Sequence, residues 1–305
     1  MDPRPHRRTR PRLGREEGTV SEDVLISAGR LAAMGSRDRD VRSVVGAQLP
    51  GYQVESVVEA GAGLDNIAYE VNGELIVRFS REPDPARRAA LVDHEARLLA
   101  AVAGISPLPV PEPRFTVADQ GCLAYRKLPG MPLVDLPQPQ RAAHARSIAA
   151  TLGEFLTALH TVPVDRMAEL VEPDDQPLAE WRREAAEAYA AVAGHVPAAH
   201  RPRVEAFLDA APPDGRYALV FSHNDLGIEH VLVAPVAGTV TGVIDWSDAA
   251  IVDPAYDFGL LYRDLGPAAD TALRSYRTDA HDVAALGQRA VFYARCSVFE
   301  EYPLP

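Results

Sequence analysis

The spacing of apolar residues changes along this chain, and this change constrains the fold more than any other feature. Over residues 52–80, three short segments alternate apolar and polar side chains between the turns GAGLDN and NGE, which predicts three antiparallel strands. Residues 86–102 have helical spacing and end before a proline-rich segment, and residues 121–130 then return to a strand and a turn. The first part of the chain is therefore expected to form a small antiparallel sheet with one helix.

Helical spacing dominates the rest of the chain. Two short strand-and-loop segments interrupt it, which predicts an island of β structure inside a helical region. The long amphipathic helices are expected at residues 141–160, 178–194 and 282–301, and the β segments at residues 219–235 and 239–248.

Three regions follow from this organisation. A basic arm and a short helical lead-in occupy residues 1–45, a sheet-containing lobe with a hinge occupies residues 46–129, and a mainly helical lobe occupies residues 130–305. Pro129 and Gly130 mark the expected boundary between the two lobes. The expected fold class is α+β, with two lobes.

The charge and cysteine content limit the function classes. The net charge is −12 although six of the first fifteen residues are Arg, so the folded part is strongly acidic. Such a field repels nucleic acid and attracts cationic small molecules. Two cysteines, no long apolar run and no signal-peptide pattern favour the reducing cytoplasm and no membrane association. We expect a monomer or weak dimer that acts on a cationic small molecule.

Two acidic motifs suggest the chemistry. The stretch FSHNDLGIEH places Asp225 on a loop and His230 five residues later, and GVIDWSD then ends a short strand with Asp245. An acid on a loop, a metal-binding side chain and a second acid suit phosphoryl transfer from a nucleotide. Asp225 would accept the proton of the attacking hydroxyl, while His230 and Asp245 would hold Mg²⁺ against the phosphates.

These motifs carry a family resemblance. HNDLGIEH, followed by GVIDWSD and DPAYDF, resembles the aminoglycoside and macrolide phosphotransferases of the protein-kinase-like fold, over about residues 51–300. The resemblance implies a bilobal kinase-like fold, ATP or GTP as co-substrate with Mg²⁺, and transfer of the γ-phosphoryl group to a hydroxyl of an antibiotic. It also implies that His223 and Asp257 support the catalytic loop.

His230 distinguishes subgroups of this family. Most aminoglycoside phosphotransferases have Asn at the position of His230, whereas macrolide enzymes and the subgroup acting on the aminoglycoside 2″-hydroxyl resemble this chain in having His. Magnesium prefers oxygen ligands, so an imidazole is expected to bind it weakly or through water.

The residues expected to bind the nucleotide are indicated by less specific motifs. GAGLDN resembles the phosphate-covering loop of the family, in which Gly61 and Gly63 would let the backbone approach the phosphates. The only lysine of the chain, Lys127, falls in the expected hinge, so Arg78 is expected to bind phosphate and to pair with Glu95.

The identity of the base and of the acceptor stays open. The purine is expected to contact the backbone around Arg126 to Leu128, which does not decide between ATP and GTP. A metabolic kinase for a sugar, an amino alcohol or a homoserine-like acceptor would share every motif, and a non-catalytic nucleotide-binding regulator is the alternative from another class. Asp248 and Asp253 would either face substrate amines or form turns.

Overall fold

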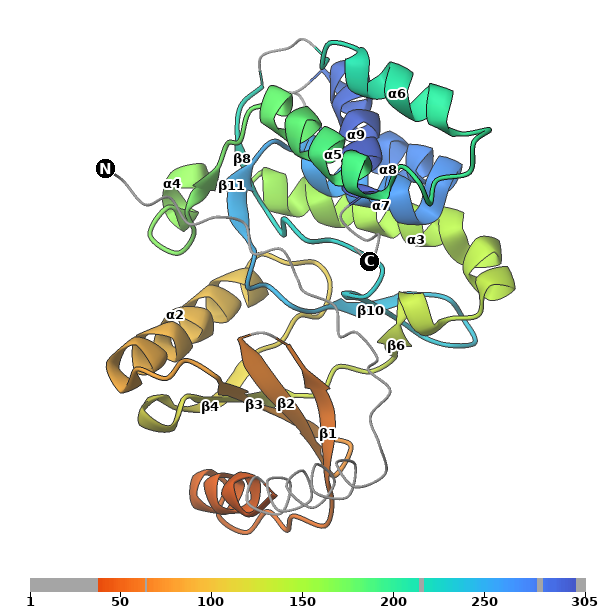
Figure 1. The fold of residues 1–305 in the computed structure, drawn as a ribbon. Coiled ribbons are helices and arrows are strands. Elements are labelled where there is room, and N and C mark those ends of the chain that lie inside the picture. Colours follow the sequence, from red (N-terminus) through yellow and green to blue (C-terminus); the bar gives the residue numbers. More distant parts are fainter. Residues whose placement is uncertain (1–37, 64, 214–216, 279–281, 300–305) are drawn as a thin grey trace, which may run out of the picture. The chain divides into compact units, whose positions relative to one another are not determined.

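The computed structural model describes most of the chain as two compact units (Figure 1). Unit 1 contains the described residues up to Ala96 together with Glu112–Lys127, and unit 2 contains Arg97–Pro111 and the described residues from Leu128 on. The expected lobes also divide near Leu128, but they assign Arg97–Pro111 to the first lobe. The expected basic arm lies mostly outside the described residues, which are 38–63, 65–213, 217–278 and 282–299.

Unit 1 is built on a five-stranded antiparallel sheet with the strand order β1-β2-β3-β5-β4. The alternating pattern of the sequence predicts its first three strands and β5, whereas β4 follows the proline-rich segment and was not predicted. Helix α2 spans Pro85–Ala103, and its residues up to Ala96 belong to unit 1. The strands are β1 (Val57–Ala62), β2 (Asn66–Val71), β3 (Leu75–Ser80), β4 (Pro113–Val117) and β5 (Cys122–Arg126).

The core of unit 1 explains the two-residue alternation. Val77 and Phe79 on β3 are buried, as is Val71 on β2, while the residues between Leu75, Val77 and Phe79 are half-buried. A helix over residues 38–48 packs Val41 and Val44 into the same core. Burial of one face therefore fixes the register of these strands, because a shift by one residue would expose the apolar side chains.

Unit 2 is mainly helical, as its sequence spacing predicts. Helix α3 packs on α8, and α7 packs on α9 (Figure 1). Gly153 allows the first contact, because a Cβ at this position would lie 2.2 Å from the carbonyl oxygen of Ala272. The helices are α3 (Gln138–His160), α4 (Val164–Met167), α5 (Leu178–Val192), α6 (Arg201–Asp209), α7 (Ala255–Leu265), α8 (Asp270–Ser275) and α9 (Val283–Ser297).

Two three-stranded sheets form the expected β island of unit 2. Their strand orders are β10-β9-β6 and β7-β11-β8. Residues 223–230 run from β8 to β9, and residues 244–249 run from β10 to β11, so both loops connect the same two sheets and lie close together. The strands are β6 (Met131–Pro132), β7 (Pro173–Asp174), β8 (Val220–Ser222), β9 (Val231–Val233), β10 (Val240–Val243) and β11 (Ala250–Val252).

Within the part of the chain that the structure describes, no helix combines the length and the apolar character needed to cross a membrane.

Candidate active site

His230 joins the two loops that connect the small sheets of unit 2. Its Nδ1 lies 2.8 Å from the backbone carbonyl oxygen of Asp225, and its Nε2 lies 3.6 Å from Oδ2 of Asp245. A carbonyl oxygen only accepts, so Nδ1 carries a hydrogen. In the neutral ring, Nε2 then holds the free electron pair on the side of Asp245. The described geometry therefore brings the three residues expected to catalyse and to bind metal into one cluster.

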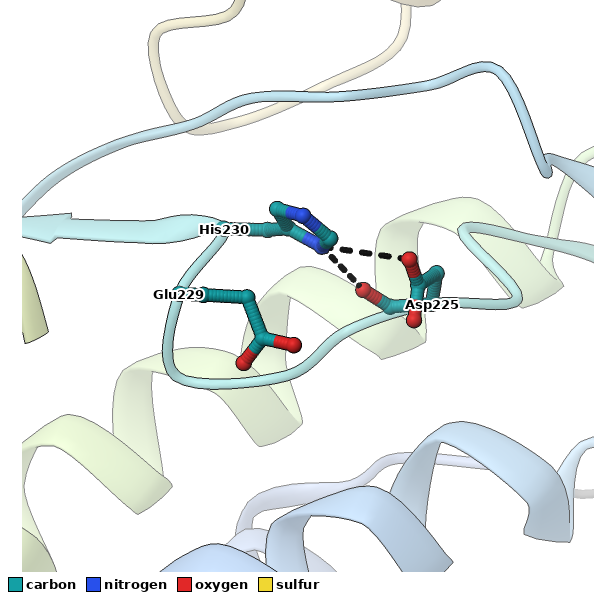
Figure 2. A group of neighbouring side chains, drawn as sticks. All are labelled: Asp225, Glu229 and His230. Carbon is teal, nitrogen blue, oxygen red and sulfur yellow. Dashed lines mark hydrogen bonds and ion pairs between the residues drawn. The ribbon is translucent and has the colours of Figure 1, made fainter. Parts of the chain in front are cut away.

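A third acid, Glu229, lies beside Asp225 and His230 of this cluster, and the sequence pattern assigned it no role. Asp225, Glu229 and His230 each offer a ligand atom, and these three atoms lie within 4.8 Å of one another (Figure 2). Gly227 makes room for it, because a Cβ at Gly227 would lie 2.4 Å from Oε2 of Glu229. Its position directly before His230, on a short loop, is the sequence feature that could have indicated a place for Glu229 in the cluster.

Asp245 of the cluster and Asn224, which precedes Asp225, adopt the left-handed backbone conformation. Asn224 and Asp245 both have φ of 62°. Asn and Asp tolerate this region better than other residues that carry a Cβ, and such positions concentrate at functional sites. Ser247 donates a hydrogen bond of 2.9 Å to Oδ1 of Asp245. This bond orients the Asp245 carboxylate.

His223 is fully buried beneath the loop. Its Nε2 donates to the carbonyl oxygen of Ile244 at 3.0 Å, and its ring packs edge-on against Trp246 with centroids 4.6 Å apart. Burial lowers the pKa of His223 to about 4, so the imidazole is neutral near pH 7. The ring therefore links the start of the Asp225 loop to the strand end that precedes Asp245.

Asp257 fixes the Asp225 loop through hydrogen bonds. Its carboxylate accepts hydrogen bonds from the hydroxyl of Ser222 at 2.5 Å and from the backbone N–H groups of Asn224 and Leu226 at 3.0 and 3.1 Å. Asp257 is fully buried in the first turn of α7, where a negative charge is favoured by the helix dipole. The two amides flank Asp225, so Asp257 fixes the backbone on both sides of it.

Arg78 and Glu95 form an ion pair in unit 1. Nη1 of Arg78 on β3 lies 2.6 Å from Oε1 of Glu95 on α2, and the side chains are 15% and 20% exposed. This pair is the one expected from the sequence. Gly61 pairs with Ala68 where the register of β1 and β2 shifts, and a Cβ at Gly61 would meet nothing within 4 Å. Neither Gly61 nor Gly63 has positive φ, so the backbone itself does not require glycine at these positions.

The expected hinge residues lie at the ends of the two units. Arg126 is the exposed last residue of β5. Leu128 begins the second segment of unit 2, where its side chain packs near Gly242. Lys127 donates through Nζ to Oε2 of Glu70 at 2.6 Å. The only lysine is thus held by a strand glutamate.

Asp253 forms a buried network and does not face a substrate amine. Arg289 donates to both carboxylate oxygens, at 2.8 and 3.0 Å, and Tyr293 adds a third contact at 3.2 Å. Asp253 and Arg289 are 2% and 3% exposed. The sequence reading left this position open, and the burial of the pair decides it.

The comparison with known families identifies the chain. The model of the phosphotransferase enzyme family matches residues 56–292. The chain belongs to this family. The expected resemblance is thus confirmed, as is the expectation of an enzyme that transfers phosphate to an alcohol group.

Individual relatives extend this finding. Viomycin phosphotransferase of Streptomyces vinaceus is 28% identical over 209 residues, which cover 64% of this chain and 69% of that protein. The structure of the GDP and kanamycin complex of APH(2″)-IIIa is similar to this chain, with a TM-score of 0.64 and 24% sequence identity. The alignment covers 85% of this chain and 89% of that one.

A macrolide 2′-phosphotransferase of Brachybacterium faecium, solved as the apoenzyme, has a TM-score of 0.59 at 24% identity. The alignment covers 83% of this chain and 87% of that one. These similarities confirm the expected α+β kinase-like fold.

Proposed function

We propose that this phosphotransferase moves the γ-phosphoryl group of a nucleoside triphosphate onto a hydroxyl of a cationic antibiotic, with aminoglycosides first and macrolides next. The observation that carries the proposal is the cluster of Asp225, His230 and Asp245, with His230 3.4 Å from the Asp225 carboxylate and 3.6 Å from that of Asp245. An acid positioned beside a metal-binding pair is the arrangement that phosphoryl transfer requires.

Asp225 is the proposed general base. Its carboxylate is partly exposed, so a hydroxyl can reach it, while its backbone is fixed on both sides by Asp257. The proton of the acceptor hydroxyl passes to the Asp225 carboxylate as the oxygen attacks the γ-phosphorus. The bond from that phosphorus to the β–γ bridging oxygen breaks, and the nucleoside diphosphate leaves.

The donor set fits a divalent cation. Asp245 supplies carboxylate oxygens and His230 supplies Nε2. Glu229 adds a carboxylate close to Asp225 and His230. Carboxylate oxygens are the protein ligands that magnesium prefers. Bound there, Mg²⁺ would neutralise charge on the phosphate oxygens. His223 keeps the two loops together and carries no charge that would oppose the cation.

Most of the groups proposed to bind the nucleotide belong to unit 1. The Arg78 guanidinium, oriented by Glu95, would bind phosphate oxygens. The absence of a Cβ at Gly61 and Gly63 would let phosphates approach the backbone, and a Cβ at Gly61 would have nothing within 4 Å. The backbone at Arg126 and Leu128 would contact the base. Structures similar in fold carry GDP, ADP or ATP, according to their descriptions, which supports a nucleotide co-substrate.

The metabolic kinase and the regulator are less well supported. Asp225 and Asp245 are both present, and a non-catalytic regulator does not need them. The relatives named above act on antibiotics, according to their names. We propose that the enzyme works in the cytoplasm, where nucleoside triphosphates are available, and the acidic charge suits a cationic acceptor.

A coupled assay of nucleoside-diphosphate release tests the proposal. ATP and GTP are supplied separately with aminoglycosides, macrolides, viomycin and simple amino alcohols, and Asp225→Asn is the blank. We expect turnover that depends on an antibiotic acceptor. Turnover only with an amino alcohol or sugar would replace the antibiotic assignment with a metabolic one, and magnesium-dependent nucleotide binding without any phosphorylated acceptor would favour the regulator.

A further inference from the structure

A series of hydrogen bonds, buried at Asp257 and Ser222 and partly buried at His160, extends from Asp257 to residues that the proposed mechanism does not use. Oγ of Ser222 donates to Asp257, Nε2 of His160 lies 2.9 Å from Oγ of Ser222, and Nδ1 of His160 lies 2.9 Å from the hydroxyl of Tyr276. The four side chains come from β8, α7, the last residue of α3 and the residue that follows α8.

The Asp257 carboxylate, at one end of this series of hydrogen bonds, determines which group donates in each bond. An ionised carboxylate only accepts, so the single hydrogen of Ser222 points to Asp257. Ser222 must then accept from His160, which places a hydrogen on Nε2. In a neutral ring, Nδ1 then accepts from the hydroxyl of Tyr276. Burial raises the pKa of Tyr276 to about 12, so this donor keeps its hydrogen at neutral pH.

The packing around this series of hydrogen bonds holds these side chains in place. Tyr276 is buried and packs edge-on against His160 at 5.4 Å and against Phe258 at 5.1 Å between ring centroids. Ser222 and Asp257 are 1% and 0% exposed. In a low-dielectric interior, an arrangement that leaves a polar group unpaired is disfavoured, which supports the bond directions given above.

We propose that His160 and Tyr276 are positioning residues, which hold the Asp225 loop by ordering Ser222 and the Asp257 carboxylate that binds the amides of Asn224 and Leu226. The conformation of the loop then depends on His160 at the end of α3 and on Tyr276 directly after α8. The expected effect on turnover rests on the proposed role of Asp225 as general base. The expected effect on the loop backbone does not, because it can be measured without activity.

The first experiment measures hydrogen exchange at the amides of Asn224 and Leu226 by NMR in the wild type and in His160→Phe, His160→Gln and Tyr276→Phe. We expect exchange at both amides to accelerate about 10-fold or more in His160→Phe, because Ser222 and Asp257 lose their order. His160→Gln, which keeps an N–H donor for Ser222, is expected to restore most of the protection. Unchanged exchange in folded His160→Phe would overturn the proposal.

Tyr189→Phe is the matched control for Tyr276→Phe. Tyr189 is also buried in unit 2 and donates one hydrogen bond, to Glu205 at 3.1 Å, but it lies on α5. We expect only Tyr276→Phe to change exchange at Asn224 and Leu226. Equal changes in both variants would mean a general loss of stability and would overturn the positioning role.

Two further readouts separate this inference from the proposed function. The ¹⁵N shifts of His160 should report a hydrogen on Nε2, and the opposite tautomer would overturn the bond directions. With an acceptor in hand, Ser222→Ala should lower kcat about 10- to 100-fold with nucleotide KM little changed. If no acceptor is found, the proposed function fails, whereas the exchange and ¹⁵N results still decide the positioning role.

Discussion

Nε2 of His230 lies 3.6 Å from Oδ2 of Asp245, although the two residues come from different loops. Two electron-pair donors at this separation favour a shared cation. We expect Asp245→Asn to weaken Mn²⁺ binding, measured by electron paramagnetic resonance, by about 10-fold or more, because a charged ligand is lost. Asp209→Asn, on the exposed end of α6, is the control. Equal Mn²⁺ affinity in wild type and Asp245→Asn would remove Asp245 as a ligand.

Asp225→Asn should remove the general base and keep its shape. We expect kcat to fall by a factor of about 10² to 10⁴, with nucleotide affinity and the unfolding temperature close to wild type. Single-turnover kinetics with saturating nucleotide measures the chemical step. A variant that retains wild-type turnover would exclude Asp225 as the base.

Arg78→Ala should act mainly on nucleotide binding. The guanidinium is 15% exposed and oriented by Glu95, so its loss removes a preorganised phosphate ligand, and nucleotide KM should rise about 10- to 100-fold. Arg87→Ala is a matched control, because Arg87 also pairs with a glutamate, Glu82, but is 64% exposed. If both variants leave KM unchanged, the role assigned to Arg78 is wrong.

Burial of His223 makes the stability of unit 2 depend on pH. The pKa of His223 is lowered from 6.5 to about 4, so the unfolded chain binds more protons than the native state between these values. The stabilisation is complete above pH 6.5 and is lost as the pH falls toward 4.

His223→Gln should reduce the slope of the free energy of unfolding against pH in this window, measured by urea denaturation. His200→Gln, at an exposed position, should leave the slope unchanged. A slope in His223→Gln as steep as in the wild type would place the proton uptake at other groups.

Gly153→Ala and Gly46→Ala should have opposite effects on stability. A Cβ at Gly153 would lie 2.2 Å from the backbone oxygen of Ala272, so α3 and α8 must separate, at a cost of about 1–3 kcal/mol. A Cβ at Gly46, in the helix over residues 38–48, meets nothing within 4 Å and should stabilise by up to about 1 kcal/mol. Thermal unfolding measures both, and destabilisation by Gly46→Ala would contradict this account.

Local sequence determined the element types wherever one face of an element is buried. The alternation over β2 and β3 and the helical spacing of α3, α5 and α9 were readable, because burial imposes periods of two and 3.6 residues. The spacing of Asp225, His230 and Asp245 indicated phosphoryl transfer, because the three residues lie in short loops whose flanking strands were also readable. Strand β4 was not predicted because it begins with Pro113 and directly follows a proline-rich segment, which masks the strand pattern.

Tertiary structure decided what each polar side chain contacts. Asp253 and Asp257 lie four residues apart on one motif, yet Asp253 binds Arg289 on α9 while Asp257 binds the backbone of the Asp225 loop. Glu229 joins the cluster because Gly227 leaves it space, and His160 reaches Ser222 from 62 residues away. No local pattern encodes such contacts, because they depend on which elements pack together. The sequence by itself determined the family motifs and the chemistry they can perform, and the packing of unit 2 decided which side chains support it.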